Sequence, residues 1–283
     1  MTLTALGPGP IDRPAARRAE LAARLDAMRP NRLGRVAGAV LFLALVLYSA
    51  IHVELLGAKF VNGLGELASA AWMMLPPRGF EYLPEFLHAL AQTVAMAFMG
   101  TFIGAVLAVP LAIFAARTTF PVRILQFGFR RFADSLRSLD HLIWALVFVR
   151  AVGLGPLAGM MAIAIVDLGT LIKLYSEAID NIDKGPIEGV RAAGGSRLDE
   201  IRYGLLPQVV PNMLSAALYM WESNTRSATI LGIVGAGGIG YYLADRLRVY
   251  EWGQTSLIII LIVAAVYLID FVSSRVRGKL IGG

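Results

Sequence analysis

The sequence predicts an all-α protein that crosses a membrane several times. Hydrophobic residues make up 57% of its 283 residues and charged residues only 16%, whereas soluble domains carry about 25% charged residues. The apolar residues form long runs without Asp, Glu, Lys or Arg, as membrane-spanning helices require. The chain has no cysteine, which excludes a disulfide scaffold and a cysteine-based metal or redox site.

Six stretches are predicted to span the bilayer, since about 20 apolar residues cross its hydrocarbon layer. The first covers residues 36–53. The second runs from Phe86 to Ala116 and contains Pro110, which can kink a helix. The other four are expected at about 132–149, about 151–178, 203–221 and 252–269, so that residues 86–276 form a core of five transmembrane helices.

Lysine and arginine indicate the orientation of these spans. With six spans, 19 of the 26 basic residues fall on one side of the membrane and six on the other, while Lys173 lies within a span. Because cytoplasmic connections are enriched in Lys and Arg, both termini are expected in the cytoplasm of a multi-pass cell-membrane protein. The basic residues lie between apolar runs, so the net charge of +6 indicates contact with membrane lipid and no nucleic-acid partner.

Three segments lie outside the predicted core. Residues 1–35 form a basic cytoplasmic segment, in which Ala15–Met28 is either an amphipathic helix on the anionic inner leaflet or a solvated tail. Residues 54–85 form an extracytoplasmic loop, where Leu64–Leu75 is too short to span and is expected as an interfacial helix. Residues 277–283 form the cytoplasmic C-terminus.

The connection between spans four and five, residues 179–204, is predicted to form a helix, a turn and a second helix. Pro186 suits a first helical position, and Glu188 complements the helix dipole in the first turn. Glycines 194 and 195 favour a helix stop, after which Ser196 and Asp199 approximate a capping box. Such an exposed helix either docks a partner or is a solvated loop without one.

This stretch resembles the EAA motif of ATP-binding-cassette (ABC) importer permeases, in which a Gly follows six residues after the Glu and Leu-Pro closes the motif. Glu188, Gly194 and Leu206-Pro207 fall at these spacings. The sequence departs from the pattern at Gly189-Val190, where Ala-Ala is usual, and at Gly204, where Ile or Val is usual. The resemblance implies that the following residues couple the chain to an ATPase: Glu188, Gly189, Arg191, Ala192, Ala193, Gly194, Gly195, Ser196 and Pro207.

The similarity covers about residues 80–280. Glu222–Gly240 and Arg150–Pro156 are similar to segments of phosphonate-importer permeases, although methionine-importer permeases share the Gly-Ala-Gly-Gly element. The resemblance implies the ABC type I importer permease fold, six transmembrane helices with a cytoplasmic coupling helix, in a homodimer. It also implies two cytoplasmic ABC ATPase subunits that hold ATP and Mg, and an extracytoplasmic phosphonate-binding protein. The chain itself is expected to bind no cofactor or metal and to be no enzyme.

Residues 227–244 are uncharged and rich in glycine, and non-helical backbone at membrane depth must be buried in protein or line a cavity. They predict a broken or re-entrant segment between spans five and six on the outer side, with close helix packing as the alternative. Arg226, with Arg150, is hypothesised to line the outer mouth and attract an oxyanion; otherwise both reach the lipid headgroups. The candidate pathway residues are Arg150, Asn224, Arg226, Gly235, Gly237 and Gly238.

Alternative functions remain open at this stage. Within the ABC class, the solute could be phosphate, phosphite or methionine. A secondary transporter driven by an ion gradient would favour internal repeats with matched broken helices, and the sequence shows no such duplication. An intramembrane enzyme is disfavoured because no nucleophile–base arrangement or catalytic carboxylate pair is evident, and the three histidines show no metal-binding spacing.

Overall fold

The computed structural model describes residues 17–18, 20–21, 32–53, 55, 57–118 and 122–281, and these residues contain no β-strand. The chain divides into two compact units, residues 1–69 and 70–283, with α3 (Ala58–Met73) running across the division. The predicted helix at Ala15–Met28 lies outside the described residues, apart from 17–18 and 20–21, which are helical. The fold is therefore all-α over the described part of the chain.

The first unit contains α2, Arg32–His52, which matches the first predicted span. Its apolar side chains are exposed around the helix, with Leu41 71% and Phe42 69% accessible. A helix that is apolar on every face suits a lipid environment. The predicted interfacial helix at Leu64–Leu75 corresponds to α3, which begins six residues earlier and ends at Met73.

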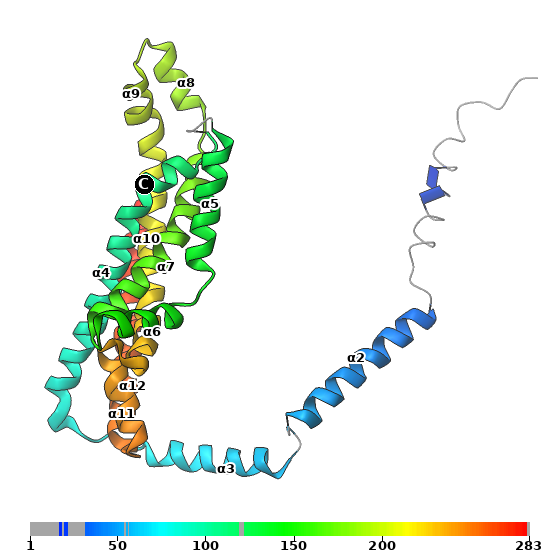
Figure 1. The fold of residues 1–283 in the computed structure, drawn as a ribbon, viewed down its shortest axis with the longest axis vertical. Helices are drawn as coiled ribbons and strands as arrows, with labels where there is room; N and C mark the ends of the chain where they lie inside the picture. Colours follow the sequence, from blue (N-terminus) through cyan, green and yellow to red (C-terminus); the bar gives the residue numbers. More distant parts are fainter. Residues whose placement is uncertain are drawn as a thin grey trace, which may run out of the picture. The chain divides into compact units, whose positions relative to one another are not determined.

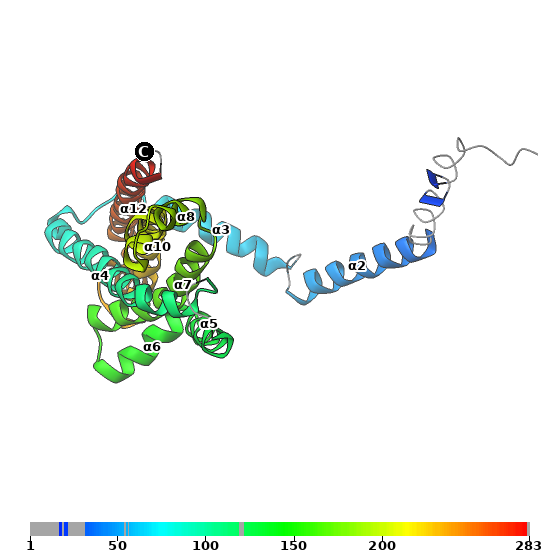
Figure 2. The same cartoon turned by 90° about the horizontal axis from the view of Figure 1, so that it is seen from above.

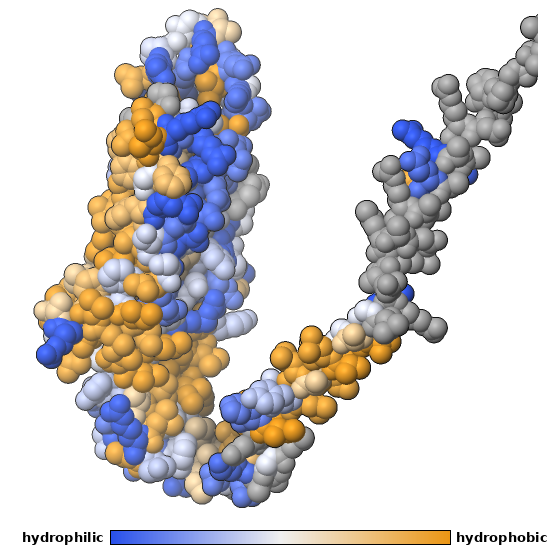
Figure 3. All heavy atoms as spheres, turned by 45° about the vertical axis from the view of Figure 1, so that its right-hand side comes forward, coloured by the Kyte–Doolittle hydropathy of each residue, from blue (hydrophilic) through white to orange (hydrophobic). Residues whose placement is uncertain are grey.

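The second unit is a bundle built around α7, Pro156–Asp180. This helix contacts α4 (Leu83–Ala115), α5 (Arg123–Arg137), α6 (His141–Val152) and α10 (Leu206–Leu231), as the view from above shows (Figure 2). The short η1 (Phe80–Tyr82) precedes α4, and α12 (Trp252–Ile281) packs on α10 and on α11 (Ile239–Arg248). Hydrophobic residues cover much of one side of this unit, whereas hydrophilic residues gather at the end that bears α8 (Gly185–Ala192) and α9 (Arg197–Asp199) (Figure 3).

Small residues bring α4 and α7 close together. A Cβ atom added at Gly100 would lie 2.8 Å from Ile163 Cβ, and one added at Gly104 would lie 2.9 Å from the Ala164 carbonyl oxygen. Such small residues let membrane helices approach backbone to backbone, since lipid offers no hydrophobic force between them. Gly100 and Gly104 thus allow α4 and α7 to pack closely.

The predicted third span, at about 132–149, is wrong as a single helix. The chain instead forms α5 and then the 12-residue α6, which is too short to cross a bilayer alone. The break occurs at Asp140, whose backbone is extended and whose side-chain oxygen Oδ1 caps α6 by accepting a hydrogen bond from Leu142 N at 2.9 Å. The single third span was predicted because Asp140 was read as a charge that flanks a span, whereas it is the N-cap of a new helix.

The other predicted spans correspond to helices with shifted ends. The fourth span is α7, the fifth is α10, which continues to Leu231, and the sixth is α12, which continues to Ile281. By length and apolarity, four described helices could each cross a membrane, namely α2, η1 with α4, α7 and α12, and α10 bent onto α11 makes a fifth span. The described residues therefore support four to five spans, and the count of six is not confirmed.

The segment after α10 is broken, as its glycines predict. The π-helical turn η3, Gly232–Ala236, follows α10, and Gly237 and Gly238 then have φ of +76° and +73°. The helix that ends at Ala236 and α11 differ in direction by 61°. A Cβ atom added at Gly240 would overlap the Thr229 carbonyl oxygen, so the bend depends on the absence of a side chain at this position.

Candidate functional site

The exposed turn between α7 and α10 begins with α8, whose ends form as the sequence predicts. Pro186 lies in its first turn. Beyond its C-terminus, Gly194 has φ of +83° and donates its N–H to Arg191 O, while Gly195 donates to Val190 O, both at 3.0 Å. These two bonds make a Schellman motif, which requires the left-handed conformation that glycine adopts most easily. The helix stop is therefore encoded locally.

Ser196 starts the return segment. Its hydroxyl oxygen accepts from Asp199 N, and its own N–H donates to Asp199 Oδ2 at 2.9 Å, so that a complete capping box precedes α9. The hydrogen bonds from Ser196 hold the pKa of the Asp199 carboxyl below its usual value. After α9 the chain continues through the π-helical turn η2, Glu200–Leu205, directly into α10.

The close packing of α8 on η2 depends on Gly204. A Cβ atom here would lie 2.8 Å from Ile187 Cγ1 and 3.0 Å from Ile187 Cα. Ile or Val at this position, as in the motif that the sequence resembles, would push α8 away from η2. Glycine at position 204, where the motif usually has Ile or Val, is therefore explained by the close approach of Ile187 in the structure.

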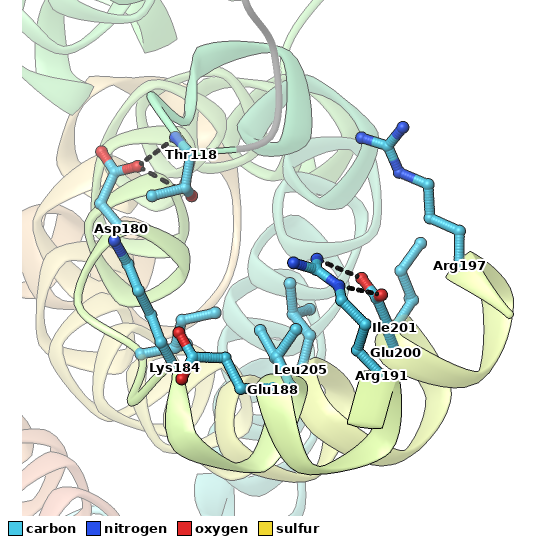
Figure 4. A pocket seen from close by; sticks show the side chains of 11 residues that line it. Thr118, Asp180, Lys184, Glu188, Arg191, Arg197, Glu200, Ile201 and Leu205 are labelled. Carbon is cyan, nitrogen blue, oxygen red and sulfur yellow. Dashed lines mark hydrogen bonds and ion pairs between the residues drawn. The ribbon is translucent and has the colours of Figure 1, made fainter. Parts of the chain in front are cut away.

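An ion pair joins the two arms of the turn. Arg191 donates from Nε to Glu200 Oε1 at 2.7 Å and from Nη2 to Glu200 Oε2 at 3.0 Å (Figure 4). This two-pronged geometry suits the planar guanidinium. Its hydrogen bonds lower the pKa of the Glu200 carboxyl and raise the pKa of Arg191. The sequence expectation included Arg191 but missed Glu200, because the two residues are nine positions apart and belong to different helical segments.

The base of the turn is fixed to the bundle. The Gln208 amide accepts from Asp183 N at 3.0 Å and donates to Asp183 O at 3.1 Å. The Asp180 carboxylate accepts from the backbone N–H groups of Arg117 and Thr118 at 2.7 and 3.1 Å, and from Arg130 Nη2 at 2.9 Å. These bonds connect the turn to α10, to the end of α4 and to α5. A force applied to α8 is therefore transmitted to three helices of the bundle.

The turn presents an exposed surface above a cavity of about 560 Å³. Glu188, Arg191 and Glu200 lie along this cavity on the α8 and η2 side, and Thr118 and Asp180 close its opposite side (Figure 4). Leu198 of α9 is 77% accessible, and this exposed apolar side chain was not among the residues expected from the sequence. Among the residues expected to couple the chain to an ATPase, Gly195 is partly buried. The others are exposed: Glu188, Gly189, Arg191, Ala192, Ala193, Gly194, Ser196 and Pro207.

The candidate pathway residues occupy different environments. Gly235, Gly237 and Gly238 pack on Leu154, Pro156 and Thr93 of other segments, and Gly155 N donates to Gly235 O at 3.0 Å. Arg150 is exposed in the last turn of α6. The structure therefore brings the three glycines together as a close-packed turn against the α6–α7 connection.

Asn224 lies in the core. It is 1% accessible and donates from Nδ2 to Thr101 Oγ1 at 2.8 Å and to Asp167 Oδ2. It thus joins α4, α7 and α10, and its side chain faces other helices. Arg226, on the same helix, is 53% accessible at its side chain and lies 3.9 Å from Glu222 Oε1.

An ion pair within the bundle was not expected from the sequence. Arg277 Nη2 of α12 donates to Glu222 Oε2 of α10 at 2.8 Å. From the sequence, Arg277 is expected in the cytoplasmic C-terminus and no role is expected for Glu222. No local sequence signal could have predicted this ion pair, because the two residues are 55 positions apart.

A family model described as "Binding-protein-dependent transport system inner membrane component" matches residues 108–280. The chain belongs to this family. The resemblance to ABC importer permeases, which rested chiefly on Glu188, Gly194 and Leu206-Pro207, is confirmed. The protein is accordingly a multi-pass permease component of a transport system in the membrane.

Two relatives of this permease have names that refer to phosphite and phosphonate transport. The putative phosphite transport system permease protein HtxC of Stutzerimonas stutzeri is 37% identical over 252 residues, which cover 89% of this chain and 88% of the relative. The putative cryptic phosphonate transport system permease protein PhnE2 of Escherichia coli K12 is 50% identical over 118 residues, covering 42% of this chain and 97% of the relative.

The fold of the permease also has a solved counterpart. A chain of the inward-facing MetNI methionine ABC transporter aligns with a TM-score of 0.62 and 23% identity, covering 72% of this chain and 99% of that chain. At this identity the likeness shows the fold alone. It confirms the expected permease fold of ABC importers.

Proposed function

We propose that this chain is the permease subunit of an ATP-driven ABC importer that carries phosphonate or a related phosphorus oxyanion into the cytoplasm. The observation that carries the proposal is the 37% identity to a phosphite permease over 89% of the chain, joined by the similarity to a phosphonate permease. The exposed α8 turn supports it, because an importer of this kind needs a rigid surface on which an ATPase can act.

In this proposal the chain forms a homodimer, and each copy presents Glu188–Ser196 to one of two cytoplasmic ABC ATPase subunits. The ATPases bind ATP and Mg, and an extracytoplasmic binding protein delivers the solute. ATP binding closes the ATPases and draws the two α8 helices together. The bonds of Gln208 and Asp180 at the base of the turn support transmission, since they tie α8 to the spans. The bundle must have two states with different affinity for the ATPase dimer.

The proposal also sets the orientation. The α8 end and both termini face the cytoplasm, and the glycine-rich turn near Gly235, Gly237 and Gly238 faces outward, with Arg150 and Arg226 along the route of the anion. Support for this comes from the excess of Lys and Arg in the connections on the α8 side.

Reconstitution tests the proposal. The permease is reconstituted in liposomes with its cognate ATPase and binding protein, and uptake of methylphosphonate, phosphite, phosphate and methionine is followed with ATP on the ATPase side. We expect ATP-dependent uptake of at least one phosphorus oxyanion and none of methionine. Uptake of methionine alone, or uptake driven by a proton or sodium gradient without the ATPase, would overturn the proposal.

A further inference from the structure

Three charged side chains lie together on neighbouring faces of α10 and α12. The Glu222–Arg277 ion pair spans 2.8 Å, and Arg226 Nη2 lies 3.9 Å from the second oxygen of the same carboxylate. The Arg277 guanidinium also lies 5.8 Å from the centre of the Tyr219 ring. We call Glu222, Arg226 and Arg277 the charged triad.

The charged triad lies where charges are costly. The side chains of Glu222 and Arg277 are 9% and 22% accessible, and both helices are apolar enough to belong to membrane spans. Burying two ions costs more than their attraction returns unless further bonds satisfy them. Charges inside spans therefore face protein or water rather than lipid, and they commonly mark a solute route.

The triad retains hydrogen-bonding capacity. A guanidinium carries five N–H donors, yet among the described residues Arg277 makes a single side-chain hydrogen bond, to Glu222, and Arg226 makes none. Arg226 is also half exposed. With two arginines and one glutamate, the triad carries a formal charge of +1, so it has both the charge and the free donors to receive an anion.

We propose that Arg226 and Arg277 bind the phosphorus oxyanion during its passage, and that Glu222 positions Arg277 and keeps this binding weak. The inference rests on the proposed function and adds Arg277 and Glu222 to the route. Guanidinium groups match the geometry of phosphorus oxyanions. Passage requires release as well as binding, and without the carboxylate two arginines would neutralise a dianion fully and retain it.

The experiment uses the reconstituted complex of permease, ATPase and binding protein, with initial uptake rates measured over a range of oxyanion concentrations. For Arg226→Gln and Arg277→Gln we expect about a tenfold fall in uptake below saturation, through a raised KM, because each removes charged hydrogen bonds. Arg275→Gln is the matched control, since Arg275 stacks on Phe271 at 4.3 Å and lies outside the triad. Unchanged uptake in both triad variants overturns the inference.

Glu222→Gln separates positioning from simple stabilisation. Loss of the negative charge is expected to lower KM and also the maximal rate, since the anion binds more tightly and leaves more slowly. A purely structural role for Glu222 would leave KM unchanged and reduce only the amount of folded complex. That second outcome would contradict the role given to Glu222.

A paired apolar replacement tests whether the ion pair merely holds α10 against α12. Glu222→Met with Arg277→Met replaces the pair by groups that pack without charge, which often preserves stability. We expect folded complex, judged by its thermal unfolding, with impaired uptake; normal uptake would overturn the inference. If the double variant fails to fold, Arg226→Gln still tests the inference, because the Arg226 side chain is half exposed and makes no hydrogen bond with another described residue.

Lipid headgroups carry the same phosphate chemistry, so all variants are measured in phosphatidylcholine liposomes with and without phosphatidylglycerol. An arginine effect that appears only with the anionic lipid assigns the triad to lipid and overturns the inference. Failure of the proposed function is distinguishable, since the wild-type complex would then take up no phosphorus oxyanion at all. Wild-type uptake with unaffected triad variants contradicts this inference alone.

Discussion

Gly204 lies beneath α8, where the absence of a side chain lets Ile187 approach the backbone of η2. We expect Gly204→Val to displace α8, because the new Cβ would be within 3.0 Å of Ile187 Cα, and overpacking of this kind costs about 1–3 kcal/mol. ATP-driven uptake in the reconstituted complex should fall several-fold, with little change in the amount of folded permease.

Gly128→Val is the matched control for this variant. Gly128 lies in α5, outside the coupling surface, and nothing is within 4 Å of an added Cβ atom. Normal uptake by Gly204→Val, or equal losses in the two variants, would show that the contact between α8 and η2 does not position the coupling surface.

The carboxylates of the turn make its order dependent on pH. Hydrogen bonds from Arg191 and Ser196 lower the pKa values of Glu200 and Asp199 in the folded turn. Their stabilisation is therefore complete above the unfolded pKa values of about 4 and is lost as the pH falls through the lower folded values. We expect the α8–α9 turn to loosen in acid while remaining unchanged near neutral pH.

Spin labels can report this loosening, since the chain has no cysteine and single replacements label cleanly. A label at Ala192→Cys should gain mobility below about pH 4. Arg191→Gln should shift the onset to higher pH, because Glu200 then lacks the partner that lowers its pKa. A mobility that stays constant from pH 7 to pH 3 would contradict this assignment.

At the scale of elements, local signals predicted what depends on local bonds. The start of α8 next to Pro186, its stop just before Gly194 and the cap at Ser196 were all predicted, since each depends on residues within a few positions. The break at Asp140 was missed although its cap is local, because apolar length was weighed above capping. Contacts such as Gly204 with Ile187 lie beyond any sequence window, since packing sets them.

The bend between α10 and α11 depends on Gly240. An added Cβ atom would overlap the Thr229 carbonyl oxygen, so we expect Gly240→Ala to force α11 away and to lower the unfolding temperature of the purified permease by several degrees. Gly128→Ala, on α5 with nothing within 4 Å, is the control and should unfold normally. Equal unfolding temperatures for the two variants would mean that α11 relaxes without cost.

At the scale of the whole molecule, the distribution of charge gives the bundle a direction. The α8 turn lies at one end of the second unit and α11 at the other (Figure 1). Most basic residues of the connections belong to the α8 side, and the rule that such residues stay inside predicts that this end faces the cytoplasm. Every proposed partner depends on this direction, because the ATPase and the binding protein approach from opposite sides.

Cysteine accessibility tests the direction in intact cells. Ser196→Cys and Arg248→Cys are exposed positions at the two ends of the unit. A thiol reagent that cannot cross the membrane should label Arg248→Cys in whole cells, and should label Ser196→Cys only after the membrane is opened. The reverse pattern would place α8 outside the cell, out of reach of a cytoplasmic ATPase, and the coupling role of Glu188–Ser196 would then be untenable even though the fold and the family are unchanged.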